Sequence, residues 1–297
     1  MSDGRIAILT ATRGRPEKLK RMLQGMGVSV ADKSRVSHWI AADEDDLDTI
    51  NLVRFGQLER LTGYPVHLHV GPKPRKLPDV WNGVWRAAKQ DGDIFIGFTD
   101  DYEVRSQGWD EQVRLALGAY DDGIAIAHLP DPTSPNVITI ICATARVFEE
   151  LGYFVVPYFP YWFADSWMDN IATMIQRRIR IDIEVGPQDG SRGRTQGMRN
   201  LRFWFDFSHQ MLGERREMAE KLRRLAYPIG SPKYIQSRQN EEELIRAWQA
   251  YFDQVSLDRL DEIEKNNADA LGPPSATYLA IEEEARQHLK QWRAKQP

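Results

Sequence analysis

Three acidic side chains follow a short apolar run at residues 94–98, IFIGF. They are Asp100, Asp101 and Glu103. Because the run is hydrophobic throughout and too short for a helix, it predicts a buried strand of a parallel sheet, and ligands bind at the carboxyl ends of such strands. Neighbouring carboxylates repel one another, and Mg²⁺ or Mn²⁺ is commonly held by one or two carboxylates plus substrate phosphates. The pattern predicts a divalent cation here, with an ordinary polar turn as the alternative.

A loop with two arginines separates the first predicted strand from the first predicted helix. Residues 5–12 form an apolar run rich in β-branched residues, and Pro16 starts a segment with apolar residues at helical spacing. Arg13 and Arg15 lie between them. Guanidinium groups and the backbone N–H groups of a helix N-terminus both attract anions, so the loop predicts an anion site. It has neither GxGxxG nor P-loop spacing.

Acidic residues also follow the second predicted strand, and basic residues follow the third. Residues 36–42 end at an acidic run that contains Asp43 and Asp45 and directly precedes a predicted helix. Such acids usually cap a helix or complement its dipole, and binding of a ligand is the alternative. The third strand, at 65–70, leads into a proline-rich basic loop, where Lys76 is either solvated or close to phosphates.

Two further acids follow a segment that is rich in aromatic residues. The segment 155–170 reads VVPYFPYWFADSWMDN, and Asp165 and Asp169 share one face if its second half is helical. Aromatic side chains beside an acid are typical of a pocket that stacks a carbohydrate or a base. Part of this aromatic set must nevertheless belong to the core, so a pocket wall that includes Tyr161 and Trp162 and a buried cluster both remain open.

Alternating strands and helices predict the fold class. A β-α-β-α-β-α-β order with right-handed crossovers gives a doubly wound, mostly parallel α/β sheet whose polar strand ends share one edge. From residue 201 the chain changes to long charged helical segments, and Ser275 is a candidate N-cap for the last of them. We predict a main domain at 1–230 and a helical appendage at 231–297, which packs on the main domain or on a second copy of the chain.

Composition excludes several classes of protein. The 297 residues are 42% hydrophobic and 28% charged, which is typical of a globular protein with a sizeable core. A net charge of −4 does not support a general nucleic-acid or membrane-surface binder. Cys142 is the single cysteine, and no apolar window is long enough for a signal peptide or a membrane span. We expect a cytoplasmic protein.

Taken together, these motifs resemble GT-A glycosyltransferases of the family 2 type. The resemblance covers roughly residues 5–200 and consists of ILTATRGRPEKLKRML, IAADEDD, the helix around Asn82, GDIFIGFTDDYEV, the GWD after it, and WFADSWMDN. In that family a P-T-R-x-R-P-like loop ends the first strand, an acid follows the second strand, and an Asn precedes a Gly-Asp and a strand. A DxD-like cluster then follows, and a catalytic Asp lies in an aromatic-rich segment.

The resemblance implies a role for each matching residue. Nucleotide binding is assigned to Thr10, Thr12, Arg13, Arg15, Asp43, Asp45, Lys76, Asn82 and Asp100. Asp100 and Asp101, with Glu103, would hold Mn²⁺ or Mg²⁺ on the diphosphate, although Thr99 stands where the family has its first acid. Asp165 is the expected general base and Asp169 the second candidate. Acceptor binding is assigned to Trp109, Tyr161 and Trp162.

We therefore expect a metal-dependent glycosyltransferase that moves a sugar from a nucleotide-diphosphate sugar to an acceptor hydroxyl with inversion. A bound cation neutralises the leaving diphosphate, and the general base takes the acceptor's proton. The alternatives are a sugar nucleotidyltransferase, although ILTATRGRP lacks the glycines of its usual loop, and a non-catalytic module that binds sugar or nucleotide. A homo-oligomer formed through the C-terminal helices is compatible with the sequence, which identifies neither the sugar nor the acceptor.

Overall fold

The chain forms two compact units, seen in a computed structural model. The first comprises Met1–Val155 and Arg177–Gly193, and the second comprises Val156–Gln176 and Arg194–Pro297. The structure describes residues 4–73, 76–132, 134–160, 163–188, 199–254, 260–265 and 274–295. The domain boundary predicted between residues 230 and 231 lies within the second unit and stays a prediction.

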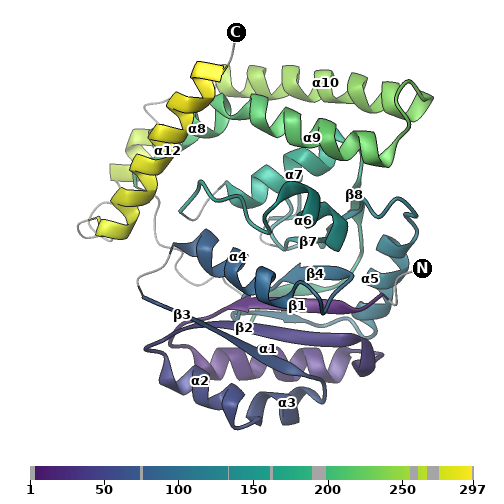
Figure 1. Ribbon diagram of the computed structural model, residues 1–297, viewed down its shortest axis with the longest axis vertical. Helices are drawn as coiled ribbons and strands as arrows, with labels where there is room; N and C mark the ends of the chain where they lie inside the picture. Colours follow the sequence, from purple (N-terminus) through teal and green to yellow (C-terminus); the bar gives the residue numbers. More distant parts are fainter. Residues whose placement is uncertain are drawn as a thin grey trace. The chain divides into compact units, whose positions relative to one another are not determined.

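A seven-stranded sheet forms the centre of the first unit (Figure 1), in the order β3-β2-β1-β4-β7-β6-β8. Its strands are β1 (Ile6–Ala11), β2 (Val36–Asp43), β3 (Val66–Gly71), β4 (Ile94–Gly97), β6 (Ile126–His128), β7 (Cys142–Thr144) and β8 (Arg178–Arg180). Strands β1 to β4 pair in parallel, and only β7 runs against its neighbours β4 and β6 among these strands. The mostly parallel α/β sheet is therefore confirmed, and the carboxyl ends of β1, β2 and β4 share one edge.

Helices cover both faces of this sheet (Figure 1). They are α1 (Pro16–Ser29), α2 (Leu47–Arg54), α3 (Gln57–Thr62), α4 (Leu77–Ala88), α5 (Trp109–Gly118) and α6 (Ala145–Leu151). Helix α1 buries four apolar residues at helical spacing, Leu19, Met22, Leu23 and Met26, against the sheet. Gly27 lets α1 approach α3 closely, because a Cβ there would lie 2.7 Å from the Cα of Thr62.

A second, two-stranded sheet lies beside the acidic loop that follows β4. It pairs β5 (Tyr102–Val104) with β9 (Val185–Pro187) in antiparallel fashion. Glu103 lies on β5, opposite Gly186. This small sheet brings a segment from far along the chain next to the acidic loop.

The second unit is helical. It contains α7 (Ala164–Met174), α8 (Leu201–Gln210), α9 (Leu212–Ala226), α10 (Pro232–Gln254) and α12 (Ala276–Lys295). Fully buried Arg223 of α9 pairs with fully buried Glu241 of α10, and Ser275 caps α12 by accepting from the Tyr278 backbone N–H at 3.2 Å. The predicted C-terminal helices are present. Among the described residues, no helix has both the length and the apolar character that crossing a membrane requires.

Candidate nucleotide-sugar site

Asp100 and Asp101 lie at the carboxyl edge of the sheet and contact the arginine loop that follows β1. Asp100 is 0% exposed, and its Oδ2 accepts a hydrogen bond of 2.5 Å from the Thr12 hydroxyl. Its Oδ1 lies 2.7 Å from Arg15 Nη2, and Arg15 Nη1 lies 3.6 Å from Oδ2 of Asp101. Burial raises the pKa of Asp100, and the bond from Thr12 and the charge of Arg15 oppose that shift. Arg15 therefore compensates the charge of this acid pair.

Gln188, which directly follows β9, fixes the backbone of the acidic loop. Its N–H donates to the carbonyl of Asp101 at 2.8 Å, and its Nε2 donates to the carbonyl of Asp100 at 3.0 Å. The same Nε2 contacts the carbonyl of Lys18 on α1 at 3.0 Å. Gln188 thus ties the acidic loop to α1. Sequence reasoning missed this residue, because it lies 88 positions beyond Asp100 and belongs to no motif.

Arg13 joins the loop after β1 to the loop after β2. It pairs with Asp43, and its Nη1 and Nη2 lie 2.9 Å and 3.1 Å from the two carboxylate oxygens of Asp45. Lys73 Nζ lies 2.8 Å from the same carboxylate. Hydrogen bonds from Arg13, and to a lesser extent from Lys73, hold the pKa of Asp45 well below its usual range. Hydrogen bonds to Asp45, and to a lesser extent to Asp43, raise the pKa of Arg13. Both partners are therefore charged at neutral pH.

The acid that caps α2 is Asp46. Its side chain accepts from the Thr49 backbone N–H at 3.3 Å and from the Gly14 backbone N–H at 2.8 Å. The capping alternative considered for this acidic run therefore applies to Asp46. Asp43 and Asp45 instead contact Arg13, and their contact with a nucleotide stays a prediction.

Each of the three acids predicted to bind a divalent cation contacts an arginine. The carboxylate of Glu103 accepts from Arg105 at 2.9 Å and 3.0 Å and lies 3.6 Å from Arg21, and its role as a metal ligand stays a prediction. Within the described ranges, no three His, Cys, Asp or Glu side chains are grouped to hold a metal. Asp100 and Asp101 suit a cation that takes its remaining ligands from a diphosphate, provided that Arg15 moves away from them.

Two residues assigned to the nucleotide are buried in other contacts. Thr10 is 0% exposed, and its hydroxyl donates to the carbonyl of Phe98 at 2.7 Å. Because the hydroxyl has only one hydrogen, His38 Nε2 must be the donor in the 2.8 Å bond between it and the Thr10 oxygen. Asn82 accepts from the backbone N–H groups of Phe154 and Val155 at 2.8 and 3.0 Å and donates to the Val155 carbonyl. Both predictions need correction, because these side chains hold β-strand ends and loops together.

The structure describes only one of the three aromatic residues predicted to bind the acceptor. Trp109 is 2% exposed within the hydrophobic core of the first unit, so its predicted contact with an acceptor does not fit the structure. Its position directly after Gly108, at the start of α5, makes it a core residue of that helix. Tyr161 and Trp162 lie outside the described residues. Lys76 is half-buried just before α4, and its contact with phosphate stays a prediction.

Asp165 and Asp169 belong to the second unit. Both lie on α7, so the helix that their shared face requires is present. Both are half-buried, and Asp165 is in the first turn, where its Oδ1 accepts from the Ser166 N–H at 2.8 Å. The aromatic residues beside them are partly core, because Phe159 and Trp167 are each 1% exposed and pack edge to face. The catalytic role of Asp165 is not tested by these contacts.

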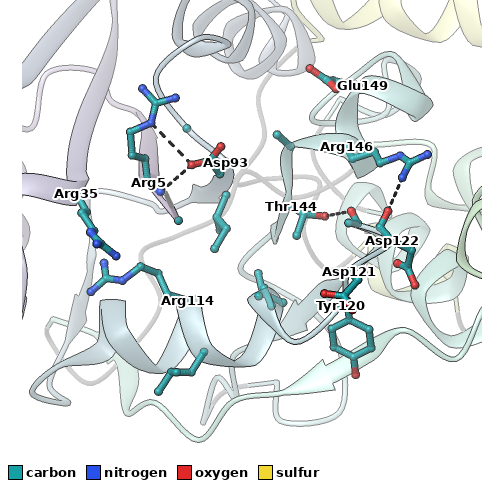
Figure 2. A pocket seen from close by; sticks show the side chains of 18 of the residues that line it. Arg5, Arg35, Asp93, Arg114, Tyr120, Asp121, Asp122, Thr144, Arg146 and Glu149 are labelled. Carbon is teal, nitrogen blue, oxygen red and sulfur yellow. Dashed lines mark hydrogen bonds and ion pairs between the residues drawn. The ribbon is translucent and has the colours of Figure 1, made fainter. Parts of the chain in front are cut away.

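A separate cavity of about 1120 Å³ lies at the amino ends of β1 and β4 (Figure 2). Its charged groups largely satisfy one another. Arg5 pairs with Asp93 through its backbone N–H at 2.9 Å and its side chain at 3.8 Å, and Arg146 donates to the Asp122 carbonyl at 2.6 Å. None of the residues assigned above to nucleotide, metal or acceptor lines this cavity.

Comparison with known proteins shows the fold. No protein-family model matches the chain, and no curated protein does. The solved structure of S. aureus TarS aligns with a TM-score of 0.53 at 7% identity, over 88% of this chain and 55% of that one. TarS 1–349 in complex with UDP aligns with a TM-score of 0.55 at 8% identity, over 98% of this chain and 92% of that one. The fold is GT-A-like.

Two further complexes extend the comparison. TarS 1–349 in complex with UDP-GlcNAc aligns with a TM-score of 0.50 at 10% identity, over 96% of this chain and 92% of that one. The mannosyltransferase PcManGT from Pyrobaculum calidifontis, in complex with GDP-Man and Mn²⁺, aligns with a TM-score of 0.44 at 11% identity. The alignment covers 98% of this chain and 88% of that one. At such identities the similarity shows the fold alone.

Proposed function

We propose that this chain is a glycosyltransferase that moves a sugar from a nucleotide-diphosphate sugar to an acceptor hydroxyl. The observation that supports this most is the meeting of three loops, after β1, β2 and β4, at one edge of the sheet. They bring two arginines together with two pairs of carboxylates. The same edge binds nucleotides in other open α/β sheets. TarS, which shares the fold, has been solved with UDP and UDP-GlcNAc.

The loops after β1 and β2 recognise the nucleoside. Asp43 and Asp45 carry acceptor oxygens for hydroxyl or N–H groups of a ribose or base, and Arg13 orients them. Because Asp45 stays ionised, it offers acceptor oxygens only. This arrangement favours recognition of the donor over participation in chemistry.

The diphosphate lies at the N-terminus of α1, beside Arg15. Helix N-termini favour anions, and the N-cap Arg15 makes no side-chain capping bond there. A divalent cation on Asp100 and Asp101, when bound, neutralises charge on the leaving nucleoside diphosphate. Thr12 bonds the carboxylate of Asp100, and Gln188 bonds its backbone carbonyl. These bonds hold Asp100 in place before the donor binds.

Asp165 takes the proton from the acceptor hydroxyl. This step follows from the family position and from its half-buried place at the start of α7, next to the aromatic segment. Attack by the deprotonated oxygen from the face opposite the leaving group inverts the anomeric centre. Asp169, one turn further along α7, is the second candidate for the base.

A panel of nucleotide sugars with Mn²⁺ tests the proposal. Release of free nucleoside diphosphate from one donor, absent in an Asp101→Asn variant, is the expected result. Release of pyrophosphate from a nucleoside triphosphate and a sugar phosphate would instead identify a nucleotidyltransferase. Binding of a donor with no release, even with a range of saccharide acceptors present, would identify a non-catalytic module.

A further inference from the structure

We propose that Arg15 is an exchangeable counter-cation, which occupies the acid pair in the nucleotide-free protein and moves to the diphosphate when the donor binds. The acid pair is Asp100 and Asp101. In this proposal Arg15 keeps a divalent cation out until the donor is present, so the metal binds with the nucleotide rather than before it. The donor step rests on the proposed function, whereas closure of the acid pair by Arg15 does not.

The contacts of Asp100 show why the pair is closed. Its carboxylate has no solvent exposure, and its two oxygens are taken by Thr12 and Arg15. Because Thr12 directly follows β1 and is itself buried, its hydroxyl is a permanent partner. The guanidinium of Arg15 is therefore the group that must leave before a cation can reach Oδ1.

Arg15 can leave without disturbing the core. Its side chain is 44% exposed, so its guanidinium already borders solvent. Its backbone is fixed on both sides, because the Gly14 N–H is bonded to Asp46 and Pro16 begins α1. Exchange between carboxylate and phosphate thus requires only a rotation of the side chain, and the helix N-terminus offers the diphosphate a second favourable interaction nearby.

Arg13, two residues earlier, makes different contacts. It is held by Asp43 and by two hydrogen bonds to Asp45, so its guanidinium faces the carboxylates after β2 rather than those of the acid pair. Its side chain is 46% exposed, which matches the exposure of Arg15. Arg13 is therefore a suitable control for Arg15. The two arginines belong to one loop and are equally exposed, but only Arg15 neutralises the acid pair.

Charge explains the order of binding. With Arg15 in place the pair carries a net charge of about −1, which attracts a divalent cation weakly. Once the guanidinium moves to the diphosphate, Oδ1 of Asp100 and the carboxylate of Asp101 lose their contact with Arg15, and the donor adds further negative charge. The cation then meets oxygen ligands from protein and phosphate together, which is the environment that Mg²⁺ or Mn²⁺ prefers.

Titration of the nucleotide-free protein with Mn²⁺, followed by electron paramagnetic resonance of the free ion, tests the closure. We compare the wild type with Arg15→Gln, with Arg13→Gln as the matched control, and with Arg15→Gln combined with Asp101→Asn. Arg15→Gln should bind Mn²⁺ roughly tenfold more tightly than the wild type, or better, because one adjacent positive charge is gone. Arg13→Gln should gain much less, because Lys73 still neutralises Asp45, and the double variant should lose the gain.

The exchange itself is tested by repeating the titration with UDP or GDP. Nucleotide should tighten Mn²⁺ binding strongly in the wild type and much less in Arg15→Gln, whose acid pair is already open. The closure is refuted if Arg15→Gln binds Mn²⁺ no better than the wild type, or if Arg13→Gln gains equally. Thermal melts confirm that each variant is folded. Because the first titration contains no nucleotide, its outcome is independent of the sugar-donor panel.

Discussion

Asp100 and Asp101 are neighbours in the chain with different surroundings, so their substitutions should have different effects. The side chain of Asp101 is 18% exposed and lies 3.6 Å from Arg15, whereas Asp100 is fully buried. Asp101→Ala should abolish metal-dependent nucleotide binding and leave the melting temperature nearly unchanged. Calorimetry with UDP or GDP and Mn²⁺ measures the first effect, and a thermal melt measures the second. Unchanged nucleotide affinity in Asp101→Ala would remove its role in binding the metal.

Asp45 should affect recognition of the donor more than the rate of the chemical step. It is half exposed and anchored by Arg13 and Lys73, where it can bond a base or ribose equally well in the ground state and the transition state. Asp45→Asn should therefore raise KM for the donor with little change in kcat. Steady-state kinetics over a range of donor concentrations separates the two constants. A large fall in kcat at constant KM would contradict this role.

At the scale of elements, the pairing of β1 with β2 creates a pH-dependent contribution to stability. His38 lies on β2 and bonds Thr10 on β1, and burial lowers its pKa from 6.5 to about 3. Between these values the unfolded chain binds a proton that the folded chain does not, so stability falls as the pH drops below 6.5. The loss between pH 7 and pH 5 should be about 2 kcal/mol.

Denaturant titrations at pH 7 and pH 5 measure this contribution in the wild type and in His38→Gln. The variant should lose much of the difference between the two pH values, whatever its absolute stability. His67→Gln, on the half-exposed strand β3, is the matched control and should keep that difference. An equal loss in both variants would show that His38 is not the group responsible.

The elements themselves follow largely from local pattern, whereas the partners of their side chains do not. Apolar runs and helical spacing predicted strands β1 to β4 and helix α1, because burial and periodicity are local properties. The type of residue before the last helix predicted the cap at Ser275. Thr10 and Asn82 occupy motif positions but are bonded to segments 88 and 72 to 73 residues away. Such partners depend on tertiary packing, which also explains why Gln188 and the Arg15 contact could not be predicted.

At the scale of the whole molecule, the residues proposed for donor binding and for acceptor deprotonation belong to different compact units. Arg13, Arg15, Asp45 and Asp101 lie in the first unit, and Asp165 lies in the second. The two functions should therefore separate cleanly under mutation. Asp165→Asn should lower kcat by about 10²–10⁴-fold, the usual contribution of a general base, while the affinity for UDP with Mn²⁺ stays at the wild-type value.

Asp169→Asn is the matched control for Asp165→Asn, because it removes the same charge from the same helix one turn later. Both side chains are half-buried, so a general loss of α7 stability would affect both variants alike, and thermal melts would detect it. Transfer to the acceptor, nucleotide affinity and melting temperature are measured for each. If Asp169→Asn loses transfer and Asp165→Asn transfers sugar normally, the general base is Asp169, one helical turn further along α7 than proposed.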